Sequence, residues 1–567
     1  MKILLKNGSV VNVFSEEIER CDVLIEDGKI IGVGDYSDEI ADETVDISGK
    51  YVCPGFIDSH IHIESTTLTP AEFARAVVPH GTTAVLADPH EIANVCGGEG
   101  IDYMLTASEG LPLSVYIALP SCVPATPFCE SGAELRAADL SRFYDHPRVL
   151  SLGEVMNYVG VLNGDKDLMQ KIADARAQGK VINGHAPLLS GTALDAYIAS
   201  GISDDHECTS PKEAMERIRK GQRLMIRQGA HSHHLRALLP LFEQPWAPRC
   251  LLVTDDKHPA ELLRDGHLDD MIRIVAREGK DPVTAIRMAT LWAAEALGLS
   301  RIGAIAPGYR ADLLVINDPA EFVVEAVYHG GVRVAESGVA LPFDQPAVPT
   351  ELQDRVMHSF HLDTLKENDF QFDTAKGYVG VKDSRVISLI PGELLTEEWI
   401  TPVDYDQNGG VDVARDILKI AVIERHGRTS HRALGLIHGT GLQQGAVASS
   451  VSHDSHNLIV VGCDERDMVA AANCVCQMGG GYAVVADGQI LSTQPLPVAG
   501  LMSTEPADIV AQQNDQIYRA MQQLGVPKES NPLMAMAFAA LPVIPHLKLT
   551  TTGLVNGDTF SHVTLLV

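Results

Sequence analysis

The feature that most constrains the fold is an alternation of short apolar segments with helical patterns over residues 54–300. Each apolar segment is typical of a buried strand. Most of them are separated by a helical pattern such as that of residues 70–78. The middle of the chain is therefore predicted as α/β. Its eight expected strands are Phe56–Ile57, Val85–Ala87, Val115–Ala118, Val149–Leu152, Val181–Ile182, Ile202–Ser203, Leu224–Ile226 and Leu251–Val253.

Eight β/α units in about 250 residues match the size of a TIM-like (β/α)8 barrel, which we expect for residues 54–300. A doubly wound sheet is the alternative, because the order of elements alone does not exclude it. Short strands with turns occupy both flanks of this region, residues 1–53 and 301–345. We expect the two flanks to form one small β-sandwich.

The tail, residues 350–567, is predicted as a C-terminal α/β domain. It opens with a polar connecting region at residues 354–369. Strands are expected at Leu458–Val461 and Ala483–Val485, and helices at Met468–Met478 and Pro506–Leu524. The paired cysteines at 474 and 476 fall in one of these helices and are interpreted as packing residues.

The composition excludes several classes of partner. The 75 acidic and 44 basic residues give a formal net charge of −31, which repels phosphate backbones, so no nucleic-acid partner is expected. The start lacks a signal-peptide pattern, and no stretch approaches the roughly 18 apolar residues of a membrane span. Ten cysteines lie scattered without a regular framework, which indicates reduced thiols. We therefore expect a cytoplasmic protein with no membrane partner.

Metal-binding side chains gather where the expected strands end. A barrel places its catalytic residues at the C-terminal ends of its strands. The HxH pair after the first strand points to one side of an extended segment, but such a pair alone is weak evidence. The set at five strand ends is much stronger evidence, and it comprises His60, His62, Glu154, His185, His206 and Asp255.

This set of residue types suits a binuclear centre. Neutral imidazole nitrogens bind first-row divalent metals, and a carboxylate can bridge two ions. Two cations about 3.5–4 Å apart hold a hydroxide at neutral pH, because a bound water is far more acidic than bulk water. The sequence therefore predicts a metal-dependent hydrolase.

The same segments resemble the bacterial adenine deaminase family of the amidohydrolase superfamily. The first-strand segment PGFIDSHIH resembles the superfamily signature. Further segments are similar to the family itself, including its C-terminal domain: ADPHEIAN at 87–94, GEVMN at 153–157, NGHAP at 183–187, DDHE at 204–207, TDDKHP at 254–259, GAVASSVSHDSHN at 445–457 and LPVAGLMS at 496–503. The likeness covers essentially the whole chain.

The resemblance implies hydrolysis of adenine to hypoxanthine and ammonia, as in purine salvage. A metal-bound hydroxide would attack C6 at a binuclear manganese or iron centre, with zinc also compatible. Glu154 falls where some superfamily members carry a carbamylated lysine, and it would bridge the ions. Asp255 would bind metal and take the proton from the nucleophile, help that is worth about 10²–10⁴-fold. The protein is expected to be a homo-oligomer, such as a homodimer.

The residue that protonates N1 of the purine stays open. Related adenosine deaminases place a glutamate soon after the fifth-strand histidine, but His185 is followed here by Ala-Pro-Leu-Leu. Glu207, Glu91 and Asp256 are the candidates, and each is also interpretable as a partner that orients a ligand histidine. The expected substrate-binding residues are Asp88, His90, Asp256, His453 and His456.

Three further clusters receive other interpretations. His231-Ser-His233-His234 is interpreted as a solvated helix start and His80 as a structural residue. Gly479–Gly481 has no P-loop spacing and is interpreted as a tight turn. His453-Asp-Ser-His456 is either a polar turn before a strand or a loop that reaches across the barrel mouth and helps to close the site.

Two alternatives to adenine deamination remain. One is another cyclic amidine or amide hydrolase of the superfamily, such as a dihydroorotase-like or guanine deaminase-like enzyme. The other is a catalytically silent metal-binding protein built on the barrel. Replacement of Asp255 by asparagine separates an enzyme from a silent protein.

Overall fold

The computed structural model describes residues 1–230, 232–390, 395–528 and 532–567. The two flanks of the middle region meet in one sheet, because β16 (Leu313–Ile316) pairs antiparallel with β7 (Tyr51–Pro54). This seven-stranded sheet has the order β19-β18-β17-β16-β7-β2-β3. Its other strands are β2 (Ser9–Val11), β3 (Ile18–Arg20), β17 (Val324–His329), β18 (Val332–Glu336) and β19 (Val339–Ala340).

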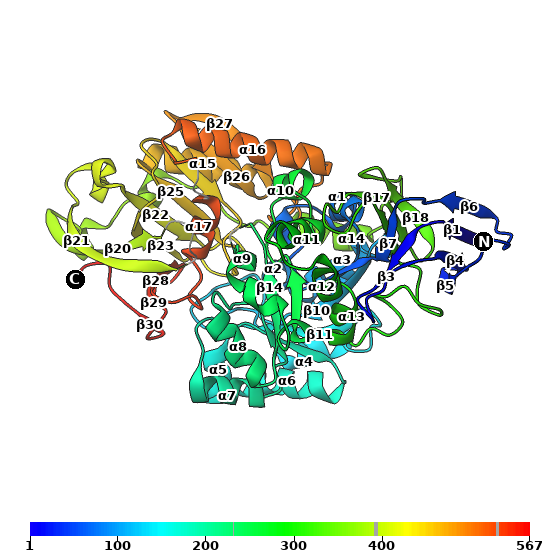
Figure 1. The fold of residues 1–567 in the computed structure, drawn as a ribbon. Helices are drawn as coiled ribbons and strands as arrows, with labels where there is room; N and C mark the ends of the chain where they lie inside the picture. The colour runs from blue at the N-terminus through cyan, green and yellow to red at the C-terminus, as the bar shows by residue number, and fades with distance from the viewer. Residues whose placement is uncertain (231, 391–394, 529–531) are drawn as a thin grey trace.

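A second, four-stranded sheet of the order β5-β4-β1-β6 belongs to the same β-rich part. The two sheets share one apolar cluster that includes Leu5, Val23, Val52 and Leu313. In Figure 1 this part lies at the right, beside the N-terminus. The strands of the second sheet are β1 (Lys2–Lys6), β4 (Asp22–Glu26), β5 (Lys29–Gly34) and β6 (Glu43–Asp46).

The described residues of the middle region contain strands at seven of the eight expected places and one strand directly after the sixth expected place. Five form a parallel sheet of the order β12-β11-β10-β9-β8, and three form a parallel sheet of the order β13-β14-β15. The strands are β8 (Phe56–Ile61), β9 (Thr82–Ala87), β10 (Ser114–Leu119), β11 (Val149–Val155), β12 (Val181–Gly184), β13 (Asp204–Asp205), β14 (Arg223–Arg227) and β15 (Cys250–Val253). The sixth strand begins two residues later than the sequence indicated.

The strand order decides against the doubly wound alternative. A doubly wound sheet reverses its strand order at a switch point, whereas both parallel sheets follow the chain without reversal. Two hydrogen bonds link the edges of the two sheets. Ser203 N donates to Ile182 O at 2.9 Å, and Asp255 N donates to His60 O at 3.1 Å. The expectation of a parallel α/β unit is therefore confirmed.

Helices follow the strands and carry their own start signals. Asp165 accepts a hydrogen bond from Leu168 N at the start of α6, and Ser210 does the same for Glu213 N at α8. The helices are α1 (Pro70–Val77), α2 (His90–Cys96), α3 (Gly98–Ala107), α4 (Ala137–Leu140), α5 (Tyr158–Asn163), α6 (Lys166–Ala177), α7 (Gly191–Ala199), α8 (Pro211–Arg219), α9 (Leu235–Leu238), α10 (Pro259–Arg264), α11 (Leu268–Arg277), α12 (Pro282–Met288) and α13 (Leu291–Ala296).

The tail is a separate C-terminal unit built on an eight-stranded sheet, which lies at the left and top of Figure 1. Its order is β21-β20-β23-β22-β25-β24-β26-β27, and the strands expected at 458–461 and 483–485 are central members. The strands are β20 (Val381–Leu389), β21 (Thr396–Asp404), β22 (Ile417–Ile423), β23 (Arg432–His438), β24 (Ala446–Ser449), β25 (Leu458–Gly462), β26 (Gly481–Ala486) and β27 (Gln489–Pro495).

The helices of the tail include both that the sequence predicted. They are α14 (Thr350–Met357), α15 (Glu465–Met478), α16 (Ala507–Gln523) and α17 (Pro532–Phe538). The segment interpreted as a polar connection thus begins inside a helix, α14, whose Val356 is buried. A small sheet of β28 (Leu547–Thr550), β29 (Gly553–Asn556) and β30 (Ser561–His562) ends the chain.

The tail packs on the middle region through α16, which contacts α10. Ser503 N also donates to Thr67 O at 2.8 Å, close to the strand ends of the middle region. Within the described ranges, no helix is long and apolar enough to cross a membrane.

Candidate metal centre and active site

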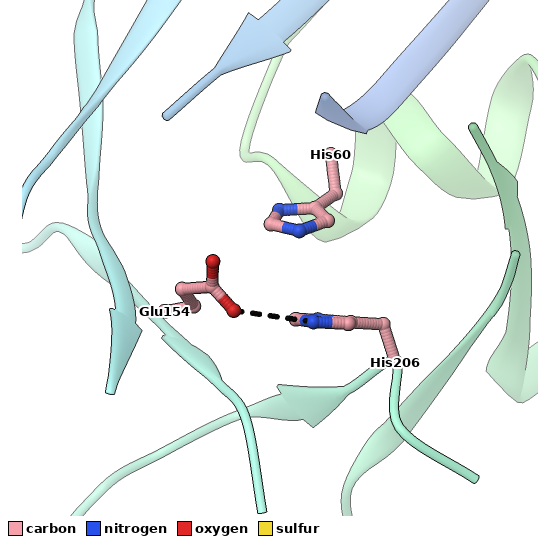
Figure 2. Close-up of side chains that lie close together, drawn as sticks. All are labelled: His60, Glu154 and His206. Carbon is pink, nitrogen blue, oxygen red and sulfur yellow. Dashed lines mark ion pairs between the residues drawn. The ribbon is translucent and has the colours of Figure 1, made fainter. Parts of the chain in front are cut away.

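Glu154, the second-to-last residue of strand β11, lies among three histidines. Its Oε1 is 3.3 Å from His62 Nε2, and its Oε2 is 2.7 Å from His185 Nδ1 and 3.2 Å from His206 Nε2. Figure 2 shows this carboxylate beside His206, with the ring of His60 above that of His206. The rings of His60 and His206 stack with centroids 4.2 Å apart. The predicted ligands of four strands therefore meet at one point.

Asp255 follows strand β15 and closes the group. Its Oδ1 lies 3.6 Å from His60 Nε2 and 3.3 Å from His62 Nε2. Its Oδ2 accepts a hydrogen bond from Arg227 Nη1 at 2.6 Å. Burial alone would raise the pKa of Asp255, but the charge of Arg227 and the facing histidines hold it well below the ordinary value. Asp255 is thus an ionised carboxylate with one oxygen directed at the histidines.

The donors fit divalent ions. Two of the triads whose ligand atoms lie within 4.8 Å of one another are His60, His62 and Asp255, and His60, Glu154 and His206. Across the described ranges, His60 Nε2 and Glu154 Oε2 are buried without a hydrogen-bond partner, which is costly unless a cation satisfies them. All of these side chains are buried.

A backbone contact of His62 and the charges around His206 also indicate a metal centre. His62 Nδ1 lies 3.0 Å from Asp88 O, which fixes the ring so that Nε2 faces the other donors. Burial lowers the pKa of His206, yet the carboxylates of Glu154 and Glu207 raise it to well above the ordinary value. The centre therefore favours positive charge, which a metal ion supplies in place of protons.

A cavity of about 720 Å³ opens beside the donors. Its wall includes His62, Glu154, His185, His206 and Asp255 on the side of the middle region. The opposite wall comes from the tail and consists mainly of apolar side chains: Ile390, Leu395, His453, Asp454, Phe538, Leu541, Val543, Ile544 and Pro545. A pocket of this size, with a polar wall facing an apolar one, suits one small organic ligand. His453 and Asp454, on the loop between β24 and β25, therefore line the cavity, and the interpretation that this loop helps to close the site stays a prediction.

The predicted substrate residues divide into two groups. His90, Asp256 and His453 line the cavity. Asp88 lies behind the wall, where its Oδ2 accepts a hydrogen bond from Glu154 N at 2.9 Å. His456 is also buried behind it, with Nε2 3.8 Å from Glu91 Oε2. These two residues therefore position other groups and do not face the ligand space.

The three acid candidates differ in their surroundings. Glu207 Oε1 lies 2.6 Å from Arg227 Nη1, and this guanidinium with the facing histidines outweighs burial and lowers the pKa of Glu207 far below the ordinary value. Burial raises the pKa of Glu91. Ser65 Oγ lies 2.7 Å from Glu91 Oε1 and 2.5 Å from Asp256 Oδ1. Glu207 is therefore fixed as a carboxylate, and the other two share one hydroxyl.

Three residues of the site were not found from the sequence. Arg227 ends strand β14, and a charged residue at that strand end was a usable signal. Ser65 lies in the turn after His62, and only its position identifies it. Asp454 Oδ1 lies 3.8 Å from His90 Nε2, a contact between distant segments that no local pattern indicates.

The other histidines discussed from the sequence are not among the six predicted metal ligands. His80 Nδ1 lies 3.1 Å from Asp269 Oδ2, outside the cavity wall. His233 and His234 directly precede α9, and both line the cavity, so the helix start is part of the wall. His231, the first member of that cluster, lies outside the described residues.

The families that match this chain cover the tail and the middle region separately. Residues 393–561 match the family described as "Adenine deaminase C-terminal domain", and residues 51–246 and 247–334 match the "Amidohydrolase family". An "Adenine deaminase" of Desulfatibacillum aliphaticivorans is 46% identical over 99% of this chain and 97% of its own length. The chain belongs to the adenine deaminase family. The "Adenine deaminase 2" of Carboxydothermus hydrogenoformans is 45% identical over 99% of this chain and 96% of its own length.

Membership in the adenine deaminase family confirms the resemblance that the strand-end motifs indicated. Among solved structures, a β-aspartyl dipeptidase of Fervidobacterium islandicum covers 61% of this chain and 100% of its own, with 19% identity and a TM-score of 0.48.

Proposed function

We propose that this chain hydrolyses adenine to hypoxanthine and ammonia, with the donors at the strand ends as its metal centre. The observation that carries the proposal is the meeting of six predicted ligands, five of which line a ligand-sized cavity, in a chain of the adenine deaminase family. A water oxygen is added to C6 of the purine, and the exocyclic amino group leaves as ammonia.

His60, His62 and Asp255 would hold one divalent ion, and His185 and His206 would hold another. Glu154, whose oxygens lie near His62 and His206, would contribute its carboxylate to the same centre. The chemistry that such a pair supplies is a water activated to attack at neutral pH. Manganese, iron and zinc all accept this mixture of imidazole and carboxylate, and we propose manganese or iron.

Asp255 acts as the general base. Its pKa lies well below the ordinary value, so it is ionised, which is the protonation state that a base needs. Arg227 donates a hydrogen bond to Oδ2 of Asp255, which leaves Oδ1 to face the reaction centre. The same carboxyl then delivers this proton to the departing amino group. The second proton of the water leaves the C6 hydroxyl as the carbonyl forms, and it replaces the proton that the acid gave to N1.

Protonation of N1 is assigned to the pair formed by Glu91 and Asp256. A hydroxyl has one proton to donate, so Ser65 can donate to only one of the two carboxyls, and the other must donate to Ser65. One of the pair therefore carries a proton at the wall of the cavity. Glu207, fixed as a carboxylate by Arg227, is better suited to hold His185 and His206 in place.

The proposal also includes the remaining predictions from the sequence. His90, Asp256 and His453 contact the purine, while Asp88 and His456 act through Glu154 and Glu91. The two parallel sheets act together as one (β/α)8 barrel. We further propose a cytoplasmic homo-oligomer that works in purine salvage.

A substrate panel tests the activity. Metal-loaded protein is assayed for ammonia release from adenine, guanine, adenosine and cyclic amides such as dihydroorotate. Adenine should be turned over far faster than the rest. Preferred turnover of another compound favours a different cyclic amidine or amide hydrolase, and no turnover at full metal occupancy favours a silent metal-binding protein.

A further inference from the structure

A second group of buried imidazole and carboxylate side chains contains none of the six ligands described above, although its Glu91 also lies close to His62 and His90. It joins Glu91, near the start of α2, to His453 and His456, on the loop between β24 and β25 of the tail. Their exposed fractions are 1%, 3% and 0%. Glu91 Oε1 lies 3.5 Å from His453 Nδ1, and Glu91 Oε2 lies 3.8 Å from His456 Nε2. The three ligand atoms fall within 4.8 Å of one another.

These separations match those of ligands around a single ion. Ligand atoms about 2.1 Å from one cation lie roughly 3 to 4.2 Å from each other. The two measured separations are longer than a hydrogen bond and fall inside this range. The group therefore has the spacing of a coordination shell and not that of a hydrogen-bonded network.

Buried polar atoms that lack hydrogen-bond partners also indicate a bound cation. In the part of the chain that the structure describes, Glu91 Oε2 and His456 Nε2 are buried without a hydrogen-bond partner. Such atoms are expensive to bury unsatisfied. A protonated His453 paired with Glu91 would satisfy those two residues, but it would leave His456 Nε2 without a partner. One cation satisfies both Glu91 Oε2 and His456 Nε2, with His453 Nδ1 as its third ligand.

We propose that Glu91, His453 and His456 bind a third divalent cation, separate from the binuclear centre. The imidazole and carboxylate donors select a first-row ion of the same class as manganese, iron or zinc. None of the three belongs to the six ligands of the binuclear centre, and the inference does not depend on the identity of the substrate.

The position of this ion gives it a structural task. Glu91 belongs to the middle region and both histidines to the tail, so the ion ties the two parts together at the mouth of the cavity. His453 and Glu91 also line that cavity. His90 and Asp454 make a parallel contact between the same two segments, at 3.8 Å.

Metal stoichiometry tests the site directly. The full-length protein is stripped with a chelator, reloaded with Mn²⁺ alone and dialysed, and bound manganese is measured per chain. We expect three ions for the wild type and two for His456→Gln, because His456 contacts neither the binuclear ligands nor the cavity. The matched control is His438→Gln, a half-buried histidine on β23 that bonds to Ser388, and it should keep three.

Two results would overturn the proposal: two ions in the wild type, or three in the folded His456→Gln protein. Anomalous scattering at the manganese edge from crystals of the reloaded wild type gives a second answer that needs no variant. A peak in contact with Glu91 and His456 is expected, and its absence beside two occupied sites in the binuclear centre contradicts the proposal. Both measurements are independent of adenine turnover, so failure of the proposed activity is recognised separately.

Discussion

Arg227 shows how one buried charge organises several reactive groups. Its guanidinium contacts Oδ2 of Asp255 and both oxygens of Glu207, so Asp255 keeps Oδ1 for the metal side while Glu207 is held by arginine through both oxygens. Burying these charges is tolerable only because they are paired. The planar fork of arginine suits two carboxylates better than lysine would. The residue therefore fixes both the charge and the direction of the proposed base.

Replacement of Asp255 by asparagine tests the proposed base. Asparagine keeps the size of the side chain but cannot accept the proton of the attacking water. We expect kcat for adenine to fall by at least about 10²–10⁴-fold, while the circular dichroism spectrum is retained. The exposed Asp145→Asn serves as the control and should match the wild type. Near-normal turnover by folded Asp255→Asn protein would remove the residue from the mechanism.

A buried histidine away from the metals predicts how stability depends on pH. Burial and the charge of Arg425 lower the pKa of His426 to about 3. The unfolded chain, with the ordinary histidine pKa of about 6.5, therefore binds a proton that the folded chain does not. Stability is complete above the unfolded value and is lost, at about 1.4 kcal/mol per pH unit, as the pH falls below it.

His426→Gln should therefore lose less stability than the wild type between pH 7 and pH 5. Thermal unfolding at both pH values measures the difference, with the exposed His358→Gln as the control. An equal loss in His426→Gln and wild type would show that His426 is not the neutral buried group inferred here.

At the scale of elements, helix α7 sets the distance between two strands of the metal centre. Tyr197 Oη donates to Val155 O, at the end of β11, at 2.7 Å and accepts from His185 N, after β12, at 2.9 Å. The strand ends that carry Glu154 and His185 are thus held by one hydroxyl.

Removing this hydroxyl should weaken metal binding. In Tyr197→Phe the carbonyl and the amide lose their common partner, at a cost of about 1–3 kcal/mol for each unsatisfied group. We expect the manganese concentration for half-maximal activity to rise about 10–100-fold, with activity restored by excess metal. Tyr144→Phe is the matched control, because among the described residues the buried Tyr144 hydroxyl has no hydrogen-bond partner. An unchanged manganese requirement in Tyr197→Phe would contradict this role.

The elements also show what sequence alone could and could not provide. The strands β8 to β15 were predictable because buried parallel strands are short apolar runs between helices. The metal ligands followed from them, since strand ends of such a unit meet. Asp88 and His456 were misplaced on the ligand side because a pattern gives neighbours along the chain and not the direction of a side chain. The contacts of Asp454 and Ser65 depend on how the tail packs, which no local periodicity encodes.

For the whole molecule, the cavity exists only where the two large parts meet. One wall consists of strand-end polar groups and the other of tail residues such as Phe538 and Val543. The ring of Phe538 stacks on His453 with centroids 4.5 Å apart and an interplanar angle of 10°. Apolar cover of this kind excludes water from the reaction, and it strengthens each electrostatic contact inside.

Metal removal should therefore lower the stability of the interface between the middle region and the tail, as well as that of the strand ends. A cation that binds only the folded state stabilises it by about 4 kcal/mol at a thousandfold excess over its Kd. After chelation we expect a lower midpoint of thermal unfolding and faster amide exchange in residues 450–457 and in α2. Exchange that changes at the strand ends but not in these two segments would contradict a metal link between the two parts.

The central claim is that this site adds water to adenine, and isotope labelling measures that step directly. Protein reloaded with manganese is incubated with adenine in H₂¹⁸O, and the products are analysed by mass spectrometry. The account predicts hypoxanthine with one ¹⁸O atom at C6 and one ammonia released per turnover. Hypoxanthine without the label, or no product from protein with its full metal complement, would contradict it.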